Sequence, residues 1–69
     1  MNRVSVQSSN ISSIGYDASS QTLQVQFNSG DVYEYYSVPP SEHSGLMNAS
    51  SHGKYLNANI KGSYDYQQV

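Results

Sequence analysis

The residues best suited to chemistry lie close together in the second half of the chain, in Ser50-Ser51-His52-Gly53-Lys54. A hydroxyl group, a glycine and a lysine at the start of a helix can bind an anion, because the first turn leaves backbone N–H groups free at the positive end of the helix dipole. Lys54 would supply the counter-charge, and Asn57 lies one turn further on. The pattern predicts a small anion or nucleotide site; the alternative is that Ser51 serves only as an N-cap.

Tyrosines form the second chemical feature, in the segment Tyr33-Glu34-Tyr35-Tyr36. Alternate residues of a strand point to the same side, so Tyr33 and Tyr35 share one face and Tyr36 lies on the other. We expect Tyr33 and Tyr35 to be part of the core, with their hydroxyl groups near its rim. If no helix covers the opposite face, Tyr36 is an exposed ring on which a base or a peptide side chain could stack; otherwise it is an ordinary cross-strand surface residue.

The sequence offers no suitable set of residues for catalysis or for metal binding. His43 and His52 fall on different expected elements, and the chain has no cysteine, so we expect both histidines at the surface and no metal site. A catalytic triad needs a cleft that orients three groups, and a chain of 69 residues leaves little room for one. We therefore expect a protein that is not an enzyme and that needs no cofactor.

Length and composition favour a single small domain over residues 1–69, which buries only about 60% of the surface of its unfolded chain. The lack of cysteine is compatible with a reducing compartment. No secretory signal precedes the first strand, and no apolar run approaches the ~20 residues that a membrane span needs. We expect a cytoplasmic protein without a membrane partner.

The charge balance is mildly acidic. Three cations, Arg3, Lys54 and Lys61, stand against five carboxylates, for a net charge of −2. Because Lys and Arg supply nearly all non-specific affinity for phosphates, this composition allows only weak, salt-sensitive nucleic-acid binding unless other contacts contribute.

The strongest strand signal is the alternation over residues 22–28, which sends Leu23, Val25 and Phe27 to one face. Strict alternation of this kind is typical of a strand with one buried side. Upstream, Ile14 and Tyr16 alternate in the same way, and a turn of short polar residues connects the two runs.

The next connection, Asn28-Ser29-Gly30, could form a loop of two or three residues. A two-residue loop would place Glu34 opposite Val25 on the apolar face, which is costly for an unpaired carboxylate. A three-residue loop with Gly30 in the left-handed conformation places Tyr33 there instead and turns Glu34 to solvent. We expect the three-residue loop.

Two short helices should follow the strands. Pro39-Pro40 cannot continue a ladder but suits the first turn of a helix, so Ser41-Glu42-His43-Ser44 should start one, weakened by Gly45. A second helix should follow Ser51 and end at Gly62, and the tail around Tyr64-Asp65-Tyr66 should be extended against the sheet. The expected class is α+β: a three-stranded antiparallel meander, two short helices and an extended C-terminal tail.

With these elements in place, the chain from about Val6 to Val69 resembles the KTSC domain, a small domain named after the C-terminal region of some lysyl-tRNA synthetases and also found as stand-alone proteins. The matching residues, in order, are Ser8-Ser9-Asn10-Ile11, Ile14-Gly15-Tyr16-Asp17, Thr22-Leu23-Gln24-Val25-Gln26-Phe27, Ser29-Gly30, Val32-Tyr33-Glu34-Tyr35, Val38-Pro39-Pro40, Ser51-His52-Gly53-Lys54-Tyr55-Leu56-Asn57, Ile60-Lys61 and Tyr64-Asp65-Tyr66. The resemblance implies a non-catalytic module, with a role in RNA or tRNA binding suspected from the synthetase fusion.

Three functions are consistent with these observations. The resemblance favours RNA binding through Lys54, Lys61 and exposed tyrosines. The mild acidity favours a protein-interaction or self-association module that uses a sheet face or an edge strand. The third is capture of a small anion or nucleotide at the start of the second helix, by Ser51, Gly53, Lys54 and Asn57.

Overall fold

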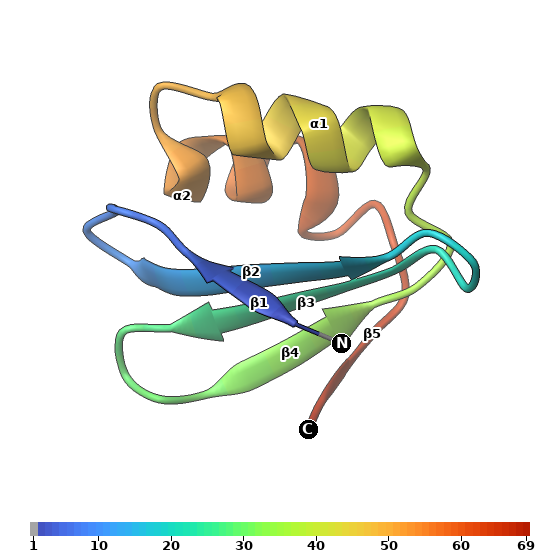
Figure 1. Cartoon of the computed structure of the whole chain (residues 1–69), viewed down its shortest axis with the longest axis horizontal. Helices are drawn as coiled ribbons and strands as arrows, with labels where there is room; N and C mark the ends of the chain where they lie inside the picture. The colour runs from blue at the N-terminus through green and yellow to red at the C-terminus, as the bar shows by residue number, and fades with distance from the viewer. Residues whose placement is uncertain (1) are drawn as a thin grey trace.

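A five-stranded antiparallel sheet forms one layer of the fold, and the helices lie across one of its faces (Figure 1). The computed structural model describes residues 2–69. The strands follow one another across the sheet in chain order. The elements are β1 (Arg3–Ser5), β2 (Ile11–Asp17), β3 (Thr22–Phe27), β4 (Val32–Tyr35), α1 (Pro40–Asn48), α2 (His52–Tyr55), the π-helix η1 (Leu56–Ile60) and β5 (Tyr66–Gln68).

The α+β class is confirmed, but the expectation of a three-stranded sheet is wrong. Strands β2, β3 and β4 are the expected meander, and each side of it carries one further strand. Strand β1 has three residues, too few for an alternating pattern to be recognised. It forms by pairing with β2, from Arg3 opposite Gly15 to Ser5 opposite Ser13. Strand β5 is the tail that was expected to lie extended against the sheet, and its Tyr66 pairs with Tyr35.

The hairpin between β3 and β4 has the three-residue loop that the sequence predicts. Gly30 has a φ of 97°, and its N–H donates to the carbonyl oxygen of Phe27 at 2.9 Å. The resulting register pairs Val25 with Tyr33, which turns the tyrosine toward the helices. Because side chains alternate along a strand, Glu34 faces the opposite side of the sheet.

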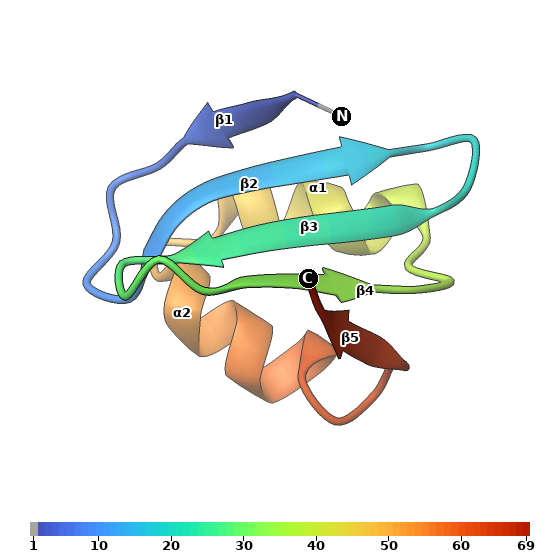
Figure 2. The same ribbon diagram turned by 90° about the horizontal axis from the view of Figure 1, so that it is seen from below.

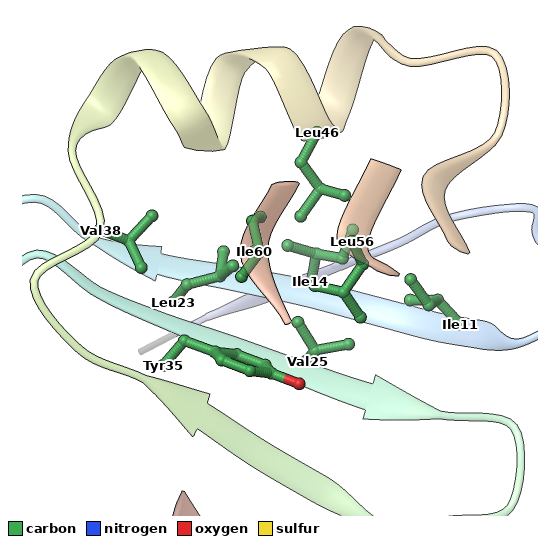
Figure 3. Packing of buried hydrophobic residues seen from close by; sticks show 9 residues of the cluster. All are labelled: Ile11, Ile14, Leu23, Val25, Tyr35, Val38, Leu46, Leu56 and Ile60. Atoms are coloured by element: carbon green, nitrogen blue, oxygen red, sulfur yellow. The ribbon is translucent and has the colours of Figure 1, made fainter. Parts of the chain in front are cut away.

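The core lies between the sheet and the helices, and among residues 2–69 nine hydrophobic side chains are buried in it (Figure 3). The strands supply five of them, α1 adds one and η1 adds two. Val38 reaches the core because Ser37 adopts a left-handed conformation, with a φ of 60°, that turns the chain after β4. The members are Ile11, Ile14, Leu23, Val25, Tyr35, Val38, Leu46, Leu56 and Ile60.

The first helix begins at Pro40, one residue before the expected start, and the second helical segment begins and ends as the sequence predicts, although its second half is the π-helix η1. Pro39 is the N-cap residue of α1 and Pro40 occupies its first turn, where the missing N–H costs nothing. Ser51 is the N-cap of α2, and its Oγ accepts a hydrogen bond from the Lys54 backbone N–H at 3.3 Å. After the helical segment, Gly62 has a φ of 88°, which ends the helix with a left-handed residue.

Gly45 has a role that helix propensity does not reveal. The Tyr55 ring packs against the Cα of Gly45, and a Cβ atom built there would lie 2.7 Å from Tyr55 Cζ and still closer to the hydroxyl oxygen. The Tyr55 hydroxyl donates to Glu42 on α1, so the ring cannot move away without losing that bond. The glycine therefore allows α1 and α2 to approach closely.

We expect Gly45→Ala to destabilise the protein by about 1 to 2 kcal/mol, because the clash outweighs a gain in helix propensity of about 1 kcal/mol. In a Tyr55→Leu background, which removes the far end of the ring, the same substitution should stabilise by up to about 1 kcal/mol. Urea unfolding of the four variants measures both effects. A stabilising effect of Gly45→Ala in the parent chain would contradict this interpretation.

Candidate functional site

A groove of about 590 Å³ opens between η1 and the β3–β4 hairpin, next to β5. In Figure 2 the sheet is seen from the face without helices; α1 lies behind it, whereas α2 and the helix that follows extend past β4 toward β5. This volume is within the range of sites that hold small molecules. The lining residues are Ser9, Asn10, Phe27, Asn28, Ser29, Asp31, Tyr33, Tyr35, Asn57, Lys61 and Tyr66.

Aromatic rings form one continuous row along the groove. Phe27 meets Tyr33 edge-on at a centroid distance of 5.6 Å, Tyr33 lies 5.9 Å from Tyr66, and Tyr66 lies 5.8 Å from Tyr35. Strand parity and the pairing of β4 with β5 bring the four rings to one face. Tyr35 is buried, but Tyr66 keeps 58% of its surface exposed, so the row ends in a ring that can stack with a flat ligand.

Asn57 and Lys61 supply the polar wall opposite the rings. They lie four residues apart on and just after η1, where the Lys61 N–H donates to the carbonyl oxygen of Leu56 five residues earlier, at 2.7 Å. Such π-helical turns occur frequently at functional sites. Both side chains are exposed, and within residues 2–69 neither has a side-chain hydrogen bond or ion pair. Their polar groups are therefore available to a ligand.

The two charged residues of the groove lie toward its opposite ends. Asp31 directly precedes β4 and therefore lies at the hairpin end. Lys61 directly follows η1, and from there the chain leads to β5. The first residue of β5, Tyr66, pairs with Tyr35 at the far end of β4, so Lys61 lies toward that end. The aromatic row, Phe27, Tyr33, Tyr66 and Tyr35, runs along the sheet from the hairpin end to the far end of β4.

The structure separates the predicted helix-start residues from the groove. The Ser51 hydroxyl is engaged as the N-cap, as the simpler interpretation predicts. Gly53 is buried against Asn10, whose Nδ2 would lie 3.3 Å from an added Cβ. Lys54 is exposed but does not line the groove. Of the five predicted residues, only Asn57 and Lys61 lie at one site, and anion binding at the helix start stays a prediction.

The open face of the sheet, where Tyr36 was predicted to be exposed, holds a row of hydrogen-bonded polar side chains. Arg3 Nη1 donates to Gln24 Oε1 at 2.6 Å, and Gln24 Nε2 donates to Glu34 Oε2 at 3.1 Å. Between them in register lies Gly15 of β2, which has no side chain to block the arginine. The Tyr36 hydroxyl donates to Glu34 Oε1 at 3.2 Å.

Tyr36 is half-buried, so its ring is less exposed than the sequence predicts. Partial burial, followed by the hydrogen bond to the Glu34 carboxylate, raises the pKa of its hydroxyl. Because the polar groups of this row bond to one another, the open face offers a ligand less than the groove does.

Both histidines are half-buried, not at the surface as predicted. The His43 ring stacks on Tyr16 at a centroid distance of 4.5 Å with 8° between the planes, because α1 lies across the sheet. Burial lowers the pKa of His43. His52 Nδ1 lies 2.8 Å from the carbonyl oxygen of Leu46. In the described part of the chain, no three acidic or histidine side chains gather as a metal site would require, and no helix has the length and hydropathy to cross a membrane.

Sequence reasoning missed most of the groove. Two loops that meet only in the folded chain contribute Asn10, Asn28 and Asp31 to the groove. The loops are joined by Asn28, whose Nδ2 donates to the carbonyl oxygens of Ser8 and Ser9. One signal was available: the alternation of Tyr64 and Tyr66 indicates a strand that adds an aromatic ring to the face shared by the β4 tyrosines.

A comparison with protein families matches residues 7–64 to the KTSC domain. A lysine–tRNA ligase of Nostoc punctiforme is 44% identical over 59 residues, which are 86% of this chain but 10% of that protein. This chain thus spans about a tenth of that ligase. An uncharacterized protein of Stutzerimonas stutzeri is 44% identical over 70 residues and covers 100% of this chain and 99% of its own length.

Among solved structures, the crystal structure of a KTSC domain protein from Yersinia pestis superposes with a TM-score of 0.96 at 37% identity. The superposition covers 99% of this chain and 96% of that one. The edge strands β1 and β5 lie outside the residues matched by the family comparison but inside this superposition.

The burial of His43 predicts a dependence of stability on pH. Its pKa in the folded chain is below the ordinary value of 6.5, so the unfolded chain takes up the proton first. The stabilisation is present above pH 6.5 and is lost as the pH falls through the lowered value. In His43→Phe, which keeps a ring on Tyr16, the free energy of unfolding should fall less between pH 7 and pH 5 than in the parent. Equal falls in both proteins would contradict the assignment.

Proposed function

Because this chain belongs to the KTSC domain family, we propose that it is a non-catalytic binding module whose groove holds an unpaired nucleotide of RNA. One observation supports the proposal above the others: the groove combines an exposed aromatic ring, Tyr66, with an unpaired cation, Lys61, among the described residues. A base is a flat ring and its phosphate is an anion, so a nucleotide can use both groups at once.

The charge of the chain is consistent with this mode of binding. With three cations and a net charge of −2, the chain cannot rely on phosphate contacts alone. Stacking of a base on an aromatic side chain contributes about 1 to 3 kcal/mol and needs no net positive charge. The proposal therefore expects modest affinity, driven mainly by Tyr66 and tuned by Lys61.

The comparisons add a second line of support. The Nostoc punctiforme relative is a lysine–tRNA ligase that contains a segment similar to this chain. A binding module for RNA would be useful to a protein of that name, which makes RNA a more natural partner than a free anion. The cytoplasmic location follows from the proposal and stays a prediction.

A protein-interaction role is the second candidate, and the sheet edges favour it. Strands β1 and β5 are the two outer strands, and each ends the sheet with unpaired backbone groups. Val4 on β1 and Val69 just after β5 are each 58% exposed. Strand addition at either edge, by a second copy or another protein, would cover these side chains.

The groove can be tested with a short single-stranded RNA in a fluorescence polarisation assay at low salt. We expect Tyr66→Ala to weaken binding by at least about fivefold, since it removes the stacking surface. Lys61→Ala should also weaken binding and should reduce the slope of log K against log salt by about 0.7, the value for one phosphate contact on a single strand.

Arg3→Ala is the matched control, because it removes the same charge from the opposite face of the sheet and should change binding less than twofold. Lys54→Ala tests the start of α2 as an alternative site for the phosphate. If Lys54→Ala and Lys61→Ala weaken RNA binding equally, the phosphate does not bind at Lys61 alone and this part of the proposal is wrong. Absence of binding to any RNA at low salt would reject the proposal. Sedimentation of a strict monomer would then count against self-association as well.

A further inference from the structure

Among the described residues that line the groove, Asp31 is the one acidic residue, and its position constrains what can lie there. By strand alternation it continues the row of Tyr33 and Tyr35, so its side chain belongs to the groove face of the sheet. Its carboxylate is exposed and accepts two hydrogen bonds, from Ser29 Oγ at 3.3 Å and from Gln68 Nε2 at 3.4 Å. Both bonds are long and weak, so a ligand with better donors can replace them.

The separation of charges sets the orientation of a bound nucleotide. A phosphate near Asp31 would be repelled, whereas a phosphate near Lys61 would be attracted. A nucleotide with its phosphate at Lys61 and its base on the aromatic row would direct the far edge of that base toward the hairpin end, where Asp31 lines the groove. The base edge therefore meets a carboxylate, which can only accept hydrogen bonds.

The four bases differ sharply in what they present to a carboxylate. The Watson–Crick edge of guanine carries two adjacent donors, N1–H and the N2 amino group, which match the two oxygens of one carboxylate. Adenine and cytosine place an acceptor nitrogen beside their amino group, and uracil places a carbonyl oxygen on each side of its N3–H. On the basis of the proposed function, we propose that this groove selects guanine, with Asp31 accepting from N1–H and the N2 amino group.

The proposal is tested with heptameric RNAs of uridine that carry one guanine, inosine, adenine or cytosine at the centre, measured by fluorescence polarisation at low salt. The guanine RNA should bind at least about fivefold more tightly than the adenine and cytosine RNAs, the lower end of the discrimination that one bidentate base contact provides. Inosine, which lacks the N2 amino group, should lie between them.

Asp31→Asn should abolish this preference by weakening the guanine RNA while leaving the others unchanged or slightly tighter. Asp17→Asn is the matched control, since it removes a carboxylate from the last residue of β2, which does not line the groove, and it should keep the preference. Thermal unfolding of both variants checks that they fold, and Asp31→Ser repeats the test with a side chain that has no amide group.

The outcomes separate the two proposals. If all central bases bind equally and binding still depends on Tyr66 and Lys61, the groove binds RNA and the guanine preference is wrong. If the preference is present but survives Asp31→Asn and Asp31→Ser, Asp31 does not read the base. If no RNA binds, the proposed function and this inference both fail.

Discussion

The parity of side chains along β4 is the constraint on which the rest of the molecule depends. The three-residue loop with a left-handed Gly30 sets it, by placing Tyr33 opposite Val25 and Glu34 on the far face. A shift by one residue would bury a carboxylate and expose the tyrosines, at a cost that a core of nine residues could not offset. The groove with its aromatic row and the polar open face both follow from this single register.

The small core also explains why tyrosine is used so heavily. A chain of 69 residues has little buried volume, and five of its seven tyrosines lie in the core or pack against it, where each ring supplies a large apolar surface. Glu42 accepts hydrogen bonds from Tyr55 and Tyr64, which ties α1 to α2 and to the tail that leads to β5. The elements that form the groove are thus held by the same residue type that lines it.

Local patterns in the sequence were sufficient for the meander, the hairpin loop and both helix starts, because alternation, proline, glycine and capping serine act within a few residues. They were not sufficient for β1, which has three residues and depends on a distant partner, or for Gly45, whose role is set by Tyr55 from another helix. The groove draws on five segments of the chain, so the sequence could group only residues close in the chain or on one strand face: Asn57 with Lys61, one turn apart, and Tyr33 with Tyr35.

Chemical-shift mapping by NMR tests the central claim most directly, because the two faces of the sheet carry different reporters. During titration with a short guanine-containing RNA, the account predicts that the largest shifts occur at Tyr33, Asn57, Lys61 and Tyr66, with little change at Gln24 and Tyr36. Shifts concentrated on the open face, at Gln24, Glu34 and Tyr36, would contradict it, since they would show that the polar row and not the aromatic groove meets the partner.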